Sequence, residues 1–296
     1  GKRLGQLGAR PEEFESVWWD EASLQKDFNQ TVVPIDLADI FMRLDQTEAA
    51  DPDVKKVVKK ILGYAQVPDV AKDSLTMLAR MEVALVRLTR EKQLDVLCVN
   101  CWTQVQQRYG ICVCSVLGRL TDQGIPCACE VDVYGGATLL AAIGAGLGKT
   151  SPHFIDWTEL HPTEENVWLA WHCGNAPQSL CSSDCQSCLN QHSIIQIKPA
   201  YGTLEFQMRP GPVTCARLVE YEGKWTMFIG TGEIVDLPPV TRGSYGWVKV
   251  KDVVDWETKM VEHGIIHHGV LIHDPAVADA LASFCKFNGI EVVRGA

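Results

Sequence analysis

Residues 94–133 read LDVLCVNCWTQVQQRYGICVCSVLGRLTDQGIPCACEVDV, and this stretch decides the expected fold. Residues 94–100 form a short, continuous apolar run, which is typical of a buried parallel strand. Residues 102–120 are expected to form a helix, and residues 125–133 a second apolar strand. A strand, a helix and a strand at this spacing make a βαβ unit. The sequence therefore predicts a doubly wound, three-layer α/β/α domain.

Helical patterns precede this unit. Residues 34–43 contain an apolar periodic run with Asp36 as the expected N-cap. Residues 52–64 form an amphipathic pattern, and residues 71–92 a longer one. With the βαβ unit, these helices assign residues 1–148 to a Rossmann-like α/β domain.

The pattern changes after residue 148. Short apolar or alternating runs, bounded by Gly, Pro and Asn, are typical of an antiparallel sheet or barrel. These runs are residues 166–172, 193–197, 203–208, 213–221 and 224–230. The last part of the chain is mixed, with helices expected at 252–261 and 275–287 and strands at 269–272 and 290–293. Residues 149–296 are therefore expected to form a mixed, largely antiparallel, barrel-like β domain.

Composition narrows the class of protein. The chain has 296 residues, of which 46% are hydrophobic and 22% charged, the balance of a soluble globular protein of about two domains. A net charge of −10, with no dense basic stripe beyond the helical face at residues 55–60, argues against nucleic-acid or anionic-membrane partners. The longest apolar stretch, residues 135–148, is too short for the roughly 20 residues of a membrane span.

The chain contains twelve cysteines. A chain of this size does not need disulfide staples. Several of the cysteines lie in apolar runs, where a free thiol behaves as a small buried hydrophobe. With no visible signal peptide, we expect a cytoplasmic protein; the absence of an initial Met indicates a removed or truncated start.

The segment GAGLGKT, residues 144–150, resembles a phosphate-binding loop. Counted from Gly144, it is one residue short of the Walker spacing, and it follows a helical pattern rather than a strand. We therefore expect a helix end and turn, and a nucleotide-binding enzyme ranks last among the alternatives.

A cysteine-rich segment offers another alternative. Cys181, Cys185 and Cys188 are spaced closely enough to converge on one zinc ion or iron–sulfur centre, and His192 follows. The segment is polar and loop-like, so free surface thiols are the favoured interpretation. A structural zinc ion in an interaction protein remains the alternative.

Carboxylates at strand ends are the stronger candidates, because ligands bind outside the carboxyl ends of parallel strands. Glu130 and Asp132 close an apolar strand, and Asp156 lies between apolar residues. Each could instead serve as an ion-pair partner or cap. Together with histidines, such oxygen ligands suit Mn²⁺ or Mg²⁺. The late histidines are His263, His267, His268 and His273.

Several blocks then point to a known family. In order, these blocks are GKRLGQLGARP (1–11), PIDLADIFMRLD (34–45), CACEVDVYGGATLL (127–140), FIDWTE (154–159), HCGNAP (172–177), YGTLEFQMRPGPVTCARL (201–218) and HHGVLIHDPAVADALASFCKFNGIEVV (267–293). They resemble the L-fucose isomerase family, in particular its divergent fucose isomerase-like branch.

The resemblance implies an aldose–ketose isomerase that depends on Mn²⁺, or on another divalent cation such as Mg²⁺. It implies that Glu130, Asp156 and His268 bind the metal. Glu130 and Asp156 would also be the catalytic acid and base of an enediol mechanism. The expected substrate is a small sugar of the fucose or arabinose type, and the expected assembly is a homo-oligomer, a trimer or hexamer.

The resemblance also implies the substrate-binding residues Asn100, Cys173, Tyr201 and His267. Two of them depart from the family pattern: Cys173 stands where a Ser is common, and His267 where an Asn is common. These departures leave the identity of the sugar open.

The resemblance also implies a further N-terminal α/β domain ahead of the first block, for which we expect no counterpart in this chain. In relatives, that domain of a neighbouring subunit helps to close the active site. The alternative to an active isomerase is therefore a non-catalytic sugar- or metal-binding module, or a truncated fragment of such an isomerase.

Overall fold

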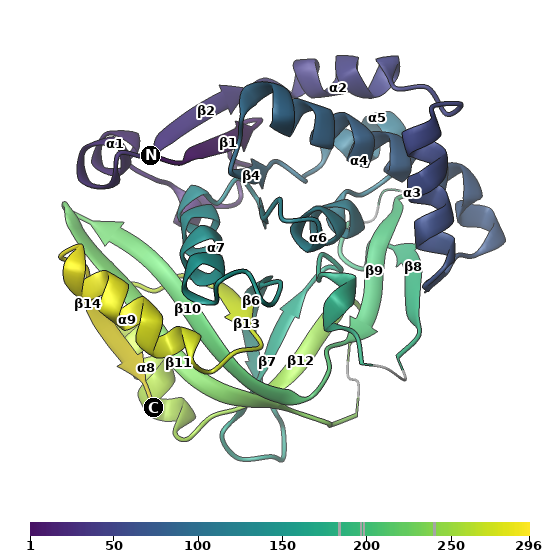
Figure 1. Cartoon of the computed structure of the whole chain (residues 1–296). Helices are drawn as coiled ribbons and strands as arrows, with labels where there is room; N and C mark the ends of the chain where they lie inside the picture. Colours follow the sequence, from purple (N-terminus) through teal and green to yellow (C-terminus); the bar gives the residue numbers. More distant parts are fainter. Residues whose placement is uncertain (183–184, 196, 198, 239–240) are drawn as a thin grey trace.

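The computed structural model describes residues 1–182, 185–195, 197, 199–238 and 241–296. It contains a parallel sheet of the order β2-β1-β4-β5, built from β1 (Arg3–Leu7), β2 (Thr31–Ile35), β4 (Val96–Val99) and β5 (Cys127–Cys129). Figure 1 shows α7 (Val133–Ala145) on one side of this sheet and α4 (Lys72–Lys92) on the other. The predicted α/β layer is confirmed.

A closed antiparallel barrel forms the second part of the fold. Each strand pairs with its neighbour in the order β11-β10-β13-β6-β7-β12, and a further β11–β12 pairing closes the ring. The barrel strands are β6 (His153–Leu160), β7 (Val167–His172), β10 (Gly211–Tyr221), β11 (Lys224–Val235), β12 (Ser244–Lys249) and β13 (His268–Ile272). Because the ring closes, each of these six strands has a partner on both sides.

Further strands extend the barrel sheet on two sides. Beyond β12 lie β9 (Tyr201–Gln207), β8 (Ser187–Gln191) and β3 (Ala65–Gln66), and β14 (Glu291–Gly295) pairs with β11. Because β3 comes from the first half of the chain, and α7 contacts β10 and β13 as well as β4 and β5, the two halves pack on each other. The division at residue 148 stays a prediction.

The remaining helices match the predicted ones closely. Besides α4, the confirmed helices are α2 (Leu37–Gln46), α3 (Pro52–Leu62), α8 (Val253–Glu262) and α9 (Val277–Phe287). The helices that were not predicted are α1 (Glu21–Phe28) and the short helices Glu15–Val17, Asp69–Ala71 and Gln178–Leu180. Asp36 caps α2 by accepting a hydrogen bond from the backbone N–H of Ala38. The predicted single helix over residues 102–120 is wrong. It is divided into α5 (Gln104–Tyr109) and α6 (Cys114–Asp122), because Gly110 turns left-handed with φ 64°.

Two strand predictions also need correction. The strand expected over residues 125–133 ends at Cys129, because Glu130 and Val131 adopt positive φ values of 51° and 59°. Residues 193–195 and 197 are not in a strand, residue 196 lies outside the described residues, and the neighbouring strand β8 ends at Gln191. Strands β1, β2, β3, β6, β8 and β12 were not predicted.

The GAGLGKT segment follows a helix, as expected. Helix α7 ends at Ala145, and Gly146 and Gly148 form the turn that leads to β6. A phosphate loop joins a strand to a helix, so this order does not fit one. Among the described residues, no helix combines the length and apolar character needed to cross a bilayer.

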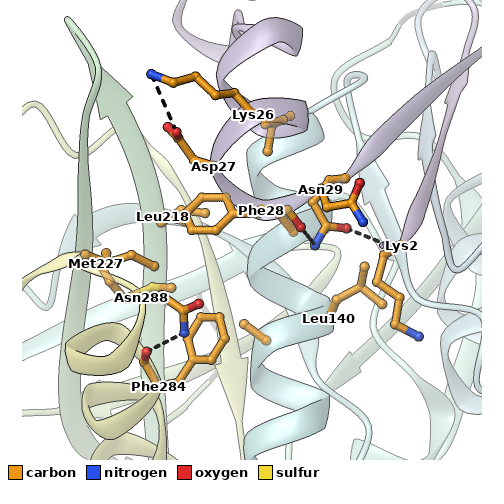
Figure 2. A pocket seen from close by; sticks show the side chains of 15 residues that line it. Lys2, Lys26, Asp27, Phe28, Asn29, Leu140, Leu218, Met227, Phe284 and Asn288 are labelled. Carbon is orange, nitrogen blue, oxygen red and sulfur yellow. Dashed lines mark hydrogen bonds and ion pairs between the residues drawn. The ribbon is translucent and has the colours of Figure 1, made fainter.

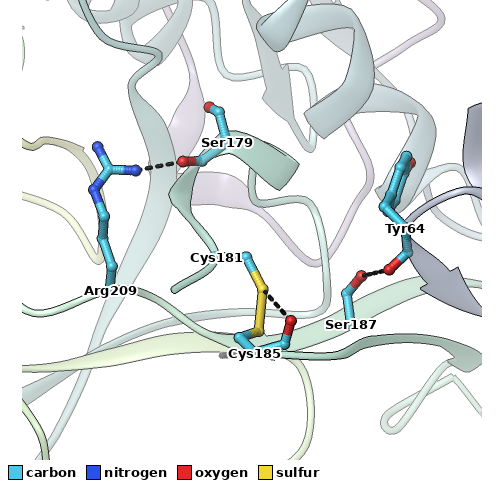
Figure 3. Close-up of a disulfide and its surroundings, with 6 residues drawn as sticks. All are labelled: Tyr64, Ser179, Cys181, Cys185, Ser187 and Arg209. Atoms are coloured by element: carbon cyan, nitrogen blue, oxygen red, sulfur yellow. Dashed lines mark hydrogen bonds between the residues drawn. A yellow bond between two sulfur atoms is a disulfide. The ribbon is translucent and has the colours of Figure 1, made fainter. Parts of the chain in front are cut away.

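The cysteine-rich segment differs from both interpretations of its sequence. Cys181 and Cys185 form a disulfide (Figure 3), so they are neither free thiols nor two thiolate ligands of a zinc ion. His192 is also engaged, because its Nδ1 atom accepts hydrogen bonds from two backbone N–H groups. The structural zinc site considered for Cys181, Cys185 and Cys188 is therefore withdrawn. The cysteines expected in apolar runs are free and buried, among them Cys98, Cys112 and Cys127.

Candidate functional site

Four side chains from different strands converge between the parallel sheet and the barrel. Glu130 follows β5, Asp156 lies on β6, His172 ends β7 and His268 begins β13. Asp156 and His268 are paired directly across the β6–β13 ladder, which places both side chains on one face. The His268 Nε2 atom lies 3.5 Å from Glu130 Oε2 and 3.4 Å from Asp156 Oδ1. Glu130 and Asp156, two of the predicted metal ligands, thus both lie close to the third, His268.

Asp132 fixes the tautomer of the His268 ring. Its Nδ1 atom lies 2.9 Å from Asp132 Oδ2, and Asp132 also accepts a bidentate hydrogen bond from Arg217. A carboxylate so held accepts a hydrogen bond from Nδ1–H, so a neutral His268 ring presents its Nε2 lone pair to Glu130 and Asp156. Asp132 was one of the strand-end carboxylates considered in the sequence. In the structure it binds the His268 ring from the side opposite Glu130 and Asp156.

The centre of the cluster consists of acceptor atoms. Glu130 Oε2 and Asp156 Oδ1 are buried and have no hydrogen-bond partner among the described residues. Each of these carboxylate oxygens faces the His268 Nε2 atom. The ligand atoms lie within 4.8 Å of one another in two groups that share His268, one with Glu130 and His172 and the other with Asp156 and His267. Burial without compensation is costly for such groups, and a divalent cation bound by oxygen and nitrogen ligands relieves it. The residues present fit a divalent cation.

The backbone aims Glu130 at this point. Two successive non-glycine residues, Glu130 and Val131, hold left-handed conformations, which are costly for a β-branched residue such as Val131. The Glu130 Oε1 atom accepts hydrogen bonds from Trp102 Nε1 at 3.1 Å and from Cys101 Sγ at 3.3 Å. The protein therefore fixes one oxygen of this carboxylate and directs the other into the cluster.

The two carboxylates differ in pKa. Burial would raise the pKa of Glu130, but His172 and His268 outweigh it and lower that pKa to about 2. Burial raises the pKa of Asp156 above its usual value, and the two histidines only partly offset it. Asp156 is also the less buried of the two, with 18% of its side chain exposed, so it marks the open side of the cluster.

His172 is the site residue that the sequence alone did not indicate. It lay inside the HCGNAP block but was not singled out. Its Nδ1 atom accepts the backbone N–H of Cys173 at 2.8 Å, so a neutral ring carries its proton on Nε2, which lies 3.7 Å from Glu130 Oε2. Burial disfavours its charged form, but Asp156 and Glu130 prevail and raise its pKa. His172 therefore faces the cluster as a donor.

The predicted substrate-binding residues occupy varied positions. Asn100 is buried, and its amide bonds to the Ala9 carbonyl and the Trp102 backbone N–H, so it supports the loop that carries Trp102. Cys173 is buried next to His172. Tyr201 lies in the main core, and its backbone bonds to Cys112. Their proposed contact with substrate stays a prediction.

His267 lies at the exposed edge of the cluster. Its ring centroid lies 4.0 Å from that of His268, and its Nδ1 atom lies 3.5 Å from the hydroxyl of Ser16. Phe14, from the same N-terminal segment, packs over His267 and His268 with ring centroids 6.2 and 6.3 Å away. This segment therefore covers the cluster from outside.

A cavity of about 530 Å³ lies elsewhere, between α1, α7 and α9 (Figure 2). Its wall is mainly apolar, with Leu140, Leu218, Met227 and Phe284, and Lys2 and Asp27 lie at its rim. No residue of the carboxylate–histidine cluster lines it. The cavity is therefore separate from the candidate metal site.

The fold and the cluster together define an α/β protein with an attached barrel and a buried carboxylate–imidazole site. Residues 170–294 match the sequence model of the L-fucose isomerase C-terminal domain. This match, over residues 170–294, agrees with the family resemblance that the sequence blocks indicated.

Two relatives of this chain are named as sulfoquinovose isomerases. The chain is 25% identical over 275 residues to the sulfoquinovose isomerase of Alkalicoccus urumqiensis, an alignment that covers 91% of this chain and 60% of the relative. It is 26% identical over 285 residues to the sulfoquinovose isomerase of Clostridium sp. (strain MSTE9), with coverage of 95% and 62%. The chain thus spans about 60% of the length of these relatives.

Proposed function

We propose that this chain contributes the catalytic centre of a metal-dependent aldose–ketose isomerase. One observation carries the proposal: two buried carboxylate oxygens, without hydrogen-bond partners among the described residues, face the Nε2 lone pair of His268. The names of the relatives support a sugar isomerase. The proposed metal ligands are Glu130, Asp156 and His268, with Mn²⁺ as the expected ion and Mg²⁺ as the alternative.

The ion would supply electrostatic stabilisation for the negative charge that develops on two neighbouring sugar oxygens. The protein supplies the proton transfers. One carboxylate takes the proton from the carbon next to the carbonyl, the second moves the hydroxyl proton from one sugar oxygen to the other through the enediol stage, and the first proton returns to the neighbouring carbon. Glu130 and Asp156 are the two candidates for this exchange. The Nε2–H group of His172 faces the same space and can donate a hydrogen bond to a sugar oxygen.

The identity of the sugar substrate is a second part of the proposal. The sequence blocks suggest a fucose- or arabinose-type substrate, whereas the relatives are named for sulfoquinovose. Charge is the main difference among these substrates, because a sulfonate is a strong anion and the other two sugars are neutral. A panel of these sugars therefore separates the two possibilities.

Metal binding is tested first, by the shift in melting temperature on addition of Mn²⁺. We expect a shift in the wild type that is lost in Glu130→Gln and His268→Ala. His273→Ala is the matched control, because His273 bonds to the Arg209 carbonyl outside the cluster. Equal shifts in all four proteins would show that the site is wrong.

Turnover is tested separately, by following ketose formation from L-fucose, D-arabinose and sulfoquinovose with Mn²⁺ present. We expect ketose from at least one of them, and none in Glu130→Gln. A wild type that binds Mn²⁺ and a sugar but forms no ketose would identify the chain as a binding module.

A further inference from the structure

Two thiols lie directly behind Glu130. Cys101 follows β4 and Cys129 ends β5, so the carboxyl ends of two paired parallel strands bring them together. Both cysteines are free, with exposed fractions of 5% and 0%. One ligand atom from each of Cys101, Cys129 and Glu130 lies within 4.8 Å of the others.

The arrangement of this trio is ordered rather than accidental. Cys101 Sγ donates to Glu130 Oε1 at 3.3 Å, and Asn175 Nδ2 donates to Cys129 Sγ at 3.3 Å. These bonds hold both sulfur atoms beside the Glu130 carboxylate. The site is therefore preorganised by contacts from the ends of two strands and from the loop after β7.

Glu130 has a different environment at each oxygen. Its Oε1 atom faces Cys101 and Trp102, whereas its Oε2 atom faces His172 and His268. The oxygen and imidazole side suits hard cations, and the sulfur side suits thiophilic ones. One carboxylate thus separates two ligand sets of different chemical character.

We propose that Cys101, Cys129 and Glu130 form a second cation site, selective for thiophilic divalent ions such as Zn²⁺ or Cd²⁺. The inference goes beyond the proposed isomerase function and does not rest on it. Two sulfur ligands with Zn–S bonds of about 2.3 Å lie about 3.8 Å apart in a tetrahedral site, so the sulfur–sulfur separation of at most 4.8 Å needs to close by about 1 Å at most. A fourth position remains for water or another ligand.

Binding replaces two S–H bonds by two metal–sulfur bonds, and both protons leave to solvent. It also removes the Cys101 hydrogen bond from Glu130 and places positive charge behind the carboxylate. We therefore expect Zn²⁺ at the thiol pair to weaken Mn²⁺ binding at the Oε2 side.

The test is a Cd²⁺ titration of the full chain without reductant, which keeps Cys181 and Cys185 oxidised. A cadmium–thiolate charge-transfer band is expected to saturate at one ion per chain. We expect the band to be absent in Cys101→Ser and in Cys129→Ser. The control is Cys127→Ser, which removes another buried thiol of the same strand and is expected to leave the band unchanged. A band that survives both serine variants would overturn the proposal.

Two further arms make the result independent of folding defects and of the isomerase proposal. His268→Ala keeps the cadmium band even though it loses the Mn²⁺ shift, so failure of one site is distinguishable from failure of the other. X-ray absorption of the zinc-loaded wild type is expected to show a first shell of about two sulfur atoms with oxygen. A shell of nitrogen and oxygen alone would refute the thiol site.

Discussion

Asp132 connects the stability of the fold to the candidate metal site, and Asp132→Asn separates the two effects. The side chain is fully buried and accepts hydrogen bonds from Arg217, from His268 Nδ1 and from the backbone N–H of Gly135 at the start of α7. Asparagine has the same shape and retains the N-cap bond. It removes the charge and replaces the acceptor oxygen that faces Arg217 and His268 by an NH2 donor.

The stability cost follows from Arg217, of which 1% of the side chain is exposed. Removal of one partner of a buried ion pair costs about 3–5 kcal/mol, because the other charge stays buried and unpaired. The affinity cost follows from His268, whose Nδ1 proton loses its carboxylate. Such a change in the partner of a metal-binding histidine lowers metal affinity by about 10–100-fold.

Glu82→Gln is the matched control. Glu82 forms another buried bidentate pair, with Arg119, at exposed fractions of 3% and 5%, and its side-chain bonds go to Arg119 and Gln123 rather than to His268. We expect urea unfolding to give a similar stability loss for both variants. Calorimetric Mn²⁺ titration, under conditions where both are folded, is expected to show a loss of affinity only in Asp132→Asn. Equal affinities would refute the inference that Asp132 fixes the His268 tautomer.

Three further predictions concern the surroundings of the site. Trp102→Phe removes the indole N–H that bonds to Glu130. Because a hydrogen bond to a charged group contributes about 1.5–3 kcal/mol, we expect calorimetry to show at least about tenfold weaker Mn²⁺ binding. An unchanged affinity would contradict this prediction. Burial lowers the pKa of His153 to about 3, so between pH 3 and about 6.5 the unfolded chain binds a proton that the folded chain does not. The free energy of unfolding therefore falls as the pH drops through this window, by up to about 1.4 kcal/mol per pH unit. We expect His153→Gln to flatten that pH dependence in urea unfolding, and equal slopes would exclude this histidine as its source. Gly202→Ala places a Cβ atom against the Cys112 carbonyl group, far inside van der Waals contact, and is expected to lower the free energy of unfolding by more than about 3 kcal/mol. The control Gly211→Ala has a similar positive φ but lies in open space, and is expected to lower it by about 1–3 kcal/mol. Similar midpoints of unfolding for the two variants would show that the close contact is relieved.

The sequence predicted the fold best where the local signals were strong. Helices α3 and α4 were predicted from their periodic apolar faces, and Asp36 correctly marked the start of α2. The predictions failed where a long-range contact decided the backbone. Gly110 interrupts a continuous helical pattern because Ile111 forms a bridge with Tyr201, which lies far away in the chain.

The candidate site divides in the same way. The blocks of the sequence pointed to Glu130, Asp156 and His268, and the fold brings these three side chains together. His172 remained unnoticed because a single histidine at the end of an apolar strand has no distinguishing pattern. The disulfide between Cys181 and Cys185 was also missed, since the spacing of cysteines is the same in thiol, metal-bound and paired states.

The amino-acid sequence by itself determined which segments form most of the helices and strands, and which residue types could bind a cation. These properties depend on neighbours a few positions apart, through apolar periodicity, capping and turn chemistry. Only the tertiary structure decided that Asp132 holds His268, that Glu130 faces imidazole on one side and thiols on the other, and that β11 closes the barrel on β12. The physical reason is that each of these contacts joins residues distant in the chain, and their geometry is set by the packing of the parallel sheet against the barrel.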